Sequence, residues 1–311
     1  MNIICVESLG IGRERFEILK AHYASMGHEF RYYMDRKEDE VTLVERMRDA
    51  DVVVISNIKL TSAVLSQCPK LRYLSVAFTG LDHIDLGYCA EHNIAVQNAA
   101  GYSTTAVSEL AVGMMLDLLR NILTLSESML HGGSRGSFLG RELRGKTVGV
   151  VGTGAIGIAT IRLLLAFGAK VIAYSRSRRP EVEALGVRYM TLDDLLKESD
   201  IVSLHVPLND ETRGLIGERE LAMMKPTALL VNTARGQVCD IPAVGKALVD
   251  GTIAGAAFDV FEQEPPLPLD HMLLSTRRCL VTPHVAFATE ESFAARADIV
   301  FSHVDEWLRQ Q

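Results

Sequence analysis

Residues 148–157 read VGVVGTGAIG, a short apolar run that leads into the spacing Gly-x-Gly-x-x-Gly. Gly152 permits a tight turn from strand to helix, Gly154 lets a pyrophosphate approach the backbone, and Gly157 lets the helix pack closely on the strand. The following helix offers unpaired N–H groups and the positive end of its dipole to the phosphates. Because a strand-like run precedes the glycines and a helical pattern follows them, the stretch predicts a dinucleotide-binding turn.

The composition is that of a globular chain long enough for two hydrophobic cores. Its 311 residues are 48% hydrophobic and 23% charged, and the formal net charge of −7 disfavours a nucleic-acid partner. The five cysteines are scattered without Cys-x-x-Cys spacing, so we expect no metal site and no disulfide framework, which fits the reducing cytoplasm. The N-terminus resembles a strand and not a signal peptide, and charges interrupt the apolar runs, so no membrane segment is expected.

Two alternating series of strands and helices divide the chain. In the first series we expect strands at 3–6, 52–56, 73–76 and 95–97, with helices near 13–26 and 42–48. In the second series we expect strands at 147–151, 170–174, 201–204, 229–232, 254–259 and 280–282. A long helix from Ser103 precedes the second series, and a last helix at 290–308 follows it. Such alternation predicts parallel sheets covered by helices.

The dinucleotide unit is therefore inserted into another α/β unit. The sequence after 283 is too short for a further domain, so we expect the last helix to return to the N-terminal unit. The predicted fold is α/β with two doubly wound parallel sheets, Rossmann-like and flavodoxin-like. Residues 1–99 and 284–311 would form the substrate domain, and residues 100–283 would form the NAD(P)-binding domain.

Six motifs in a fixed order resemble those of a known family. They are TGLDHID at 79–85, LRGKTVGVVGTGAIG at 143–157, HVPL at 205–208, NTARG at 232–236, DVFEQEP at 259–265 and TPH at 282–284. Over nearly its whole length the chain resembles the D-isomer-specific 2-hydroxyacid dehydrogenases, and most of all the hydroxypyruvate and glyoxylate reductases and the glycerate dehydrogenases. The resemblance implies hydride transfer between NAD(P)H and a small 2-oxo acid/D-2-hydroxy acid pair.

The resemblance also implies three catalytic residues, and their types suit the reduction of an oxo acid. Arg235 has the planar fork that binds a carboxylate through two hydrogen bonds. His284 suits the proton donor, and Glu264 would bind the other ring nitrogen and fix its tautomer. Each residue alone has an ordinary alternative: a surface ion pair, a solvent-facing histidine and a loop carboxylate. The shared order of the three motifs favours the catalytic interpretation.

The same motifs suggest the substrate and cofactor contacts. We expect the backbone N–H groups around Phe78, Thr79 and Gly80 to bind the substrate carboxylate opposite Arg235, although a simple glycine turn is the alternative. Asp259 is expected at the nicotinamide carboxamide, or else as the cap of a turn at a strand end. No metal is expected. The other expected cofactor-binding residues are Gly152, Gly154, Ala155, Ile156, Gly157, Ser175, Arg176, Ser177, His205, Pro207, Thr212, Thr233 and Ala234.

The loop after the second strand of this unit bears on the choice between NAD and NADP. An NAD site of this type places an Asp or Glu about 20 residues beyond the glycine turn, on the ribose hydroxyls. Here Ser175, Arg176 and Ser177 follow the strand without any acidic residue. A carboxylate would repel a 2′-phosphate, whereas serine hydroxyls and a guanidinium would bind it, so NADP(H) is favoured and NAD(H) possible. The alternative is that Arg178 and Arg179 extend a solvated run of charge.

Other functions within this fold stay open. One is an NAD(P)-sensing, corepressor-like binding protein, and another is a phosphoglycerate-type dehydrogenase without its regulatory domain. Corepressors of this fold carry terminal extensions, whereas this chain is expected to start at its first strand and end at its last helix, which favours the enzyme. The resemblance also implies a homodimer, formed through the helical region 103–130 and the Gly-rich arm 131–140.

Overall fold

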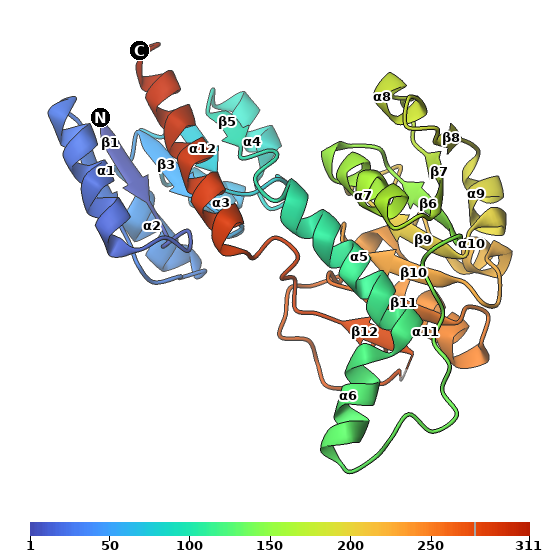
Figure 1. Ribbon diagram of the computed structural model, residues 1–311. Helices are drawn as coiled ribbons and strands as arrows, with labels where there is room; N and C mark the ends of the chain where they lie inside the picture. The colour runs from blue at the N-terminus through green and yellow to red at the C-terminus, as the bar shows by residue number, and fades with distance from the viewer. Residues whose placement is uncertain (277) are drawn as a thin grey trace. The chain divides into compact units, whose positions relative to one another are not determined.

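The computed structural model describes residues 1–276 and 278–311, and the chain divides into two compact units (Figure 1). One unit comprises Met1–Ser103 and Ala288–Gln311, and the other comprises Thr104–Phe287. Both crossings between the units lie four residues beyond the expected 99 and 283. The shift of the second crossing has a physical reason: residues after Pro283 are hydrogen-bonded to Asp259 of the second unit. His284 therefore belongs to the second unit, and the expectation that it lies in the first was wrong.

The first unit is a five-stranded parallel sheet in the flavodoxin-like order β2-β1-β3-β4-β5. β3 is a continuous, buried apolar run, and β1 and β4 are mostly apolar and buried, as expected of parallel strands covered on both faces. The C-terminal helix α12 packs on this sheet, and the Ser75 hydroxyl donates to the Val300 carbonyl at 3.0 Å. Its elements are β1 (Asn2–Cys5), α1 (Arg13–Ser25), β2 (Glu29–Tyr32), α2 (Glu40–Met47), β3 (Val52–Ile55), α3 (Ser62–Leu65), β4 (Tyr73–Val76), α4 (Leu86–Glu91), β5 (Ala95–Asn98) and α12 (Glu290–Leu308).

The second unit is a seven-stranded parallel sheet in the order β12-β11-β10-β9-β6-β7-β8. Its strands are β6 (Thr147–Val151), β7 (Lys170–Tyr174), β8 (Arg188–Tyr189), β9 (Ile201–Leu204), β10 (Leu229–Asn232), β11 (Gly255–Phe258) and β12 (Cys279–Val281). Its helices are α5 (Thr104–Arg120), α6 (Ile122–Leu130), α7 (Ala155–Ala166), α8 (Pro180–Glu183), α9 (Leu192–Glu198), α10 (Glu218–Met223) and α11 (Ile241–Asp250). The predicted fold class, two parallel-sheet α/β units, is confirmed.

Alternate residues along each central strand of this sheet enter two separate cores. Val148 and Val150 of β6 belong to the core that contains α5 and α7, whereas Val151 belongs to the core that contains α10 and α11. This is the two-residue period of a strand that is covered on both faces. The cores bury the strands and leave only the strand ends and their loops open to ligands.

Three local features differ from expectation. Strands β2 and β8 were not expected, and the helical region 103–130 is broken at Asn121. Asn121 has a left-handed φ of 53°, which asparagine tolerates better than most residues, and the Asp117 carboxylate accepts from the Leu123 N–H at 2.8 Å to begin α6. Within the described residues, no helix combines the length and apolar character that a membrane crossing needs.

Candidate active site

The strand β6 ends in a turn whose shape requires glycine. Gly152 has φ of +98°, and a Cβ there would lie 2.5 Å from the His205 carbonyl oxygen. A Cβ on Gly157 would overlap the Gly152 carbonyl, so the first turn of α7 can lie against the strand end only without a side chain. At Gly154, by contrast, no atom of the described residues lies within 4 Å of the Cβ position. Two glycines thus shape the turn, and the third leaves room beside the backbone.

The loop after β10 contains a second feature that fits a bound dinucleotide. Thr233 is buried, and its hydroxyl has no hydrogen-bond partner among the described residues. A buried hydroxyl without a partner is costly, so such atoms in native proteins commonly bind a ligand or water. Together with the open backbone at Gly154, this hydroxyl shows that the residues present fit a dinucleotide.

His205 directly follows β9, and its carbonyl group lies against Gly152 of the glycine turn. Its Nε2 lies 2.9 Å from the Ser203 hydroxyl. Although part of the residue is accessible to solvent, burial of the ring lowers the pKa of His205 to about 4. The imidazole is therefore neutral at physiological pH, so it does not add positive charge beside the turn.

We predict that His205 resists protonation throughout the physiological range. Because its folded-state pKa lies below the ordinary value near 6.5, its contribution to stability is complete above pH 6.5 and declines as the pH falls toward 4. NMR titration of the ring carbon resonance, assigned by its loss in His205→Gln, should show no midpoint above pH 5. A midpoint near 6.5 would contradict the assignment of a buried, neutral ring.

Arg176 and Glu211 face each other across the end of β6. Arg176 is the second residue after β7, Glu211 lies in the loop after β9, and Nη1 and Oε2 are 2.5 Å apart. Glu211 was not expected from the sequence, because 35 residues separate the partners and no local pattern joins them. The only available signal is indirect: both loops follow strands that a doubly wound sheet places beside the first one.

Arg235 lies three residues beyond the end of β10, at the carboxyl edge of the sheet where it was expected. The buried Asn232 side chain shapes this segment, since it donates to the Arg235 carbonyl at 2.9 Å and accepts from the Ala234 N–H at 3.0 Å. Gly236 then lets the chain pass the Phe261 backbone, where a Cβ would overlap. The backbone at Arg235 is thus set by the amide of Asn232 and a close backbone crossing, and the guanidinium donates from Nη1 to the Ala234 carbonyl at 2.7 Å.

Glu264 and His284 come together as expected. The Nδ1 atom of His284 lies 2.9 Å from each oxygen of the Glu264 carboxylate. The histidine side chain is only 12% exposed, whereas that of Glu264 is 66% exposed. Since a carboxylate accepts only, Nδ1 must carry the proton in this contact, and the tautomer and orientation of the ring follow.

The backbone at His284 is held in an unusual conformation by Asp259. His284 has φ of 54°, in the left-handed region that non-glycine residues rarely adopt. The fully buried Asp259 carboxylate accepts from the Thr282 hydroxyl at 2.5 Å and from the N–H groups of Val285 and Ala286 at 2.9 and 2.8 Å. Burial raises the pKa of Asp259, and these hydrogen bonds oppose the rise. This geometry fits the turn-capping interpretation of Asp259.

We predict that Asp259→Asn damages both stability and activity. The amide would set an N–H₂ group against backbone donors and leave one of them unsatisfied, at about 1–3 kcal/mol. The His284 turn would relax, and kcat would fall by about tenfold or more. Thermal unfolding and steady-state kinetics measure the two effects.

A matched control for this variant is Asp240→Asn. Asp240 caps α11 through one bond to the Ala243 N–H at 3.0 Å and lies on the surface. Its replacement should cost some stability and leave kcat within about twofold. Equal kinetic effects of the two variants would show that Asp259 does not position His284.

The segment Phe78–Gly80 follows β4 and belongs to the first unit. Phe78 is buried, with its ring centroid 6.0 Å from that of His83 in an edge-on contact. The Thr79 carbonyl accepts from the Asn98 side chain at 2.5 Å. Neighbouring loops therefore hold the segment in place, and its predicted substrate contacts stay a prediction.

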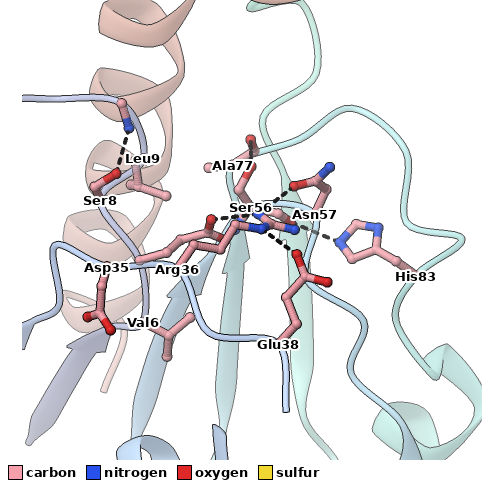
Figure 2. Close-up of polar contacts among 12 residues, drawn as sticks. Val6, Ser8, Leu9, Asp35, Arg36, Glu38, Ser56, Asn57, Ala77 and His83 are labelled. Carbon is pink, nitrogen blue, oxygen red and sulfur yellow. Dashed lines mark hydrogen bonds and ion pairs between the residues drawn. The ribbon is translucent and has the colours of Figure 1, made fainter. Parts of the chain in front are cut away.

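Polar contacts also connect the loops after β1, β2, β3 and β4, as Figure 2 shows around Ser56. The buried Glu7 accepts from the Ser56 N–H and from Arg36 Nη1, each at 2.8 Å. His83 Nε2 lies 2.9 Å from the Ser56 carbonyl oxygen, and Arg36 also donates to Asn57 at 2.9 Å. The sequence analysis missed this network because its members are far apart in the chain.

The second unit thus places a glycine turn, an arginine at a strand end and a Glu–His pair along the carboxyl edge of one sheet. A family model described as "D-isomer specific 2-hydroxyacid dehydrogenase, NAD binding domain" matches residues 112–286, which is more than half of the chain. The chain belongs to the D-isomer-specific 2-hydroxyacid dehydrogenase family. The resemblance inferred from the six motifs is confirmed.

Individual relatives match a larger part of the chain than the family model does. The chain is 40% identical over 268 residues to the glyoxylate reductase of Thermococcus litoralis, covering 83% of this chain and 80% of the relative. It is 39% identical over 270 residues to the hydroxypyruvate reductase of Thermotoga maritima, covering 83% and 88%. Among solved structures, the acyclic imino acid reductase Bsp5 with NADPH and D-Arg has a TM-score of 0.88 at 27% identity, covering 100% and 98%.

These matches decide the class of protein. The dehydrogenase is an NAD(P)-dependent oxidoreductase, as the motifs predicted. Among the described residues, no cluster of three or more His, Cys, Asp or Glu side chains has the arrangement of a metal site.

Proposed function

We propose that this dehydrogenase reduces hydroxypyruvate to the D-2-hydroxy acid, or glyoxylate to the achiral 2-hydroxy acid, with NADPH as its preferred cofactor. The observation that supports the chemistry best is the contact of His284 Nδ1 with both oxygens of Glu264. It commits one ring nitrogen to the carboxylate, so Nε2 is the nitrogen that would serve the substrate. Relatives named glyoxylate reductase and hydroxypyruvate reductase, at about 40% identity, support the choice of substrate.

Three side chains divide the work in this proposal. Arg235 holds the substrate carboxylate through its two-pronged guanidinium. The protonated His284 donates from Nε2 to the carbonyl oxygen as that oxygen becomes an alkoxide, and Glu264 keeps the ring oriented and balances its charge. When bound, the dinucleotide would supply the hydride. It would be held by the glycine turn, the 175–177 loop, His205, Pro207, Thr212, Thr233 and Ala234. Asp259 would lie near the nicotinamide carboxamide.

We predict that His284→Gln lowers kcat by about 10²–10⁴-fold, because the proton donor is lost. Glu264→Gln should lower kcat by about tenfold or more with little change in the KM for NADPH, because the ring loses its orientation but the dinucleotide site is untouched. The matched control is Glu262→Gln, since Glu262 pairs with another ring, Nε2 of His271, at 3.2 Å. The control should keep kcat within about twofold, and equal losses in both glutamate variants would count against a special role for Glu264.

The preference for NADPH has its support in the 175–177 loop, which lacks an acidic residue, and in the NADPH-bound imino acid reductase. We expect absorbance assays with hydroxypyruvate, glyoxylate, pyruvate and phenylpyruvate to show turnover that favours NADPH over NADH. Arg176→Asp should shift the ratio of kcat/KM values toward NADH by on the order of tenfold, because a carboxylate repels the 2′-phosphate. No turnover with any oxo acid, while either nucleotide still binds, would overturn the proposal and favour a nucleotide-sensing protein.

The proposal includes a homodimer in the cytoplasm. Helix α6 buries none of its residues within this chain and exposes Ile122, Leu123, Met129 and Leu130, each by more than half of its surface. Such an apolar face supports contact with a second copy. The five cysteines are free thiols, which fits a reducing compartment.

A further inference from the structure

The ion pair between Arg176 and Glu211 spans the strand that ends in the dinucleotide turn. In the sheet, β6 lies between β9 and β7, and the two partners come from the loops that follow those outer strands. The pair therefore joins the loops on either side of Gly152. Both side chains are about two-thirds exposed, so solvent and ligands reach them.

The backbone on the Glu211 side is fixed independently of the ion pair. The Asn209 side chain accepts from the N–H groups of Glu211 and Thr212 at 3.0 and 3.1 Å, and the Thr212 hydroxyl donates to the Pro207 carbonyl at 2.6 Å. These bonds make a tight turn of the kind that Asn side chains stabilise. The backbone turn that carries Glu211 is thus formed by bonds within its own loop and does not depend on the contact with Arg176.

The backbone on the Arg176 side is anchored to the glycine turn. The Tyr189 hydroxyl donates to the Thr153 hydroxyl at 2.9 Å and accepts from the Arg179 N–H at 3.1 Å. Thr153 lies inside the turn, between Gly152 and Gly154. Both loops are therefore held beside the same turn, and the ion pair connects them there.

We propose that Glu211 competes with a ligand phosphate for Arg176, and so limits how strongly the protein distinguishes a 2′-phosphorylated dinucleotide from an unphosphorylated one. The inference rests on the proposed role of Arg176 at the 2′-phosphate. A phosphate monoester carries about −1.5 to −2 charges at neutral pH, so it is repelled by the carboxylate that holds the guanidinium. An unphosphorylated ribose is neutral and meets no such repulsion. Glu211 thus weakens the preference for NADP(H) and leaves NAD(H) usable.

The test compares adenosine 2′,5′-bisphosphate with 5′-AMP, two probes that differ only by the 2′-phosphate. Isothermal titration of the full chain at low salt should show that Glu211→Gln binds the bisphosphate about threefold to fivefold more tightly, the upper part of the range expected for an exposed ion pair. Binding of 5′-AMP should change by less than about 1.5-fold, because that probe lacks the charge that is repelled. In an Arg176→Gln background the Glu211→Gln effect should become clearly smaller, since no guanidinium remains to compete for and only the direct repulsion between Glu211 and the phosphate is left.

The matched control is Glu198→Gln, which removes the same charge from another exposed pair of this unit, Arg188 with Glu198 at 3.0 Å. This variant should leave both probes unaffected. A Glu211→Gln effect that is absent, equal for both probes, shared by Glu198→Gln or undiminished in the Arg176→Gln background overturns the proposal. If Arg176→Gln alone fails to weaken the bisphosphate, the proposed NADPH site is also wrong. If Arg176→Gln does weaken it and Glu211→Gln changes nothing, only the competition fails.

Discussion

The buried carboxylate of Asp259 stabilises the turn at His284, on which the proposed chemistry depends. Three donors, from Thr282, Val285 and Ala286, converge on it from the segment that follows β12. A left-handed conformation at a non-glycine residue costs on the order of 1–3 kcal/mol and persists only where its surroundings hold it. Asp259 supplies that restraint at His284. It is also the residue after β11, so the segment that leads to Glu264 starts from the same buried position.

The parallel sheet explains why the remaining groups collect at one edge. Every strand of the second unit runs in the same direction, so the residues after β6, β7, β9, β10 and β11 follow carboxyl ends on a single edge. Burial keeps His205 neutral on this edge, while Arg176 and Arg235 provide positive charge. Glu211 pairs with Arg176, whereas Glu264 pairs with His284. Both side chains of the first pair are about two-thirds exposed, but the His284 side chain is only 12% exposed.

The features that could be predicted, the glycine turn and most strands, depend on residues that are adjacent in the sequence. The glycine turn was readable because the three glycines and their flanking strand and helix are contiguous. β6, β7, β9 and β10 have the predicted bounds because buried parallel strands are predominantly apolar runs. The strand at Glu29–Tyr32 was missed, since its charged residues hide the short pattern.

What could not be predicted depends on contacts between distant residues. The donors to Asp259 include two backbone N–H groups more than 25 residues away, and nothing in Val285 or Ala286 signals that role. The same bonds place His284 in the second unit, contrary to the expected boundary. Arg235, Glu264 and His284 were identified through their resemblance to a family, and only the fold brings Glu264 and His284 into contact.

The most direct test of this account is proton NMR of the His284 ring. A ring N–H that donates to a carboxylate resonates far downfield, and we expect such a signal for Nδ1 in the unliganded protein. It should disappear in Glu264→Gln and persist in Glu262→Gln. It should also be lost in Asp259→Asn, in which Glu264 and His284 are both intact. A signal that survives the loss of Asp259 unchanged would contradict the claim that this buried carboxylate holds the catalytic turn in place.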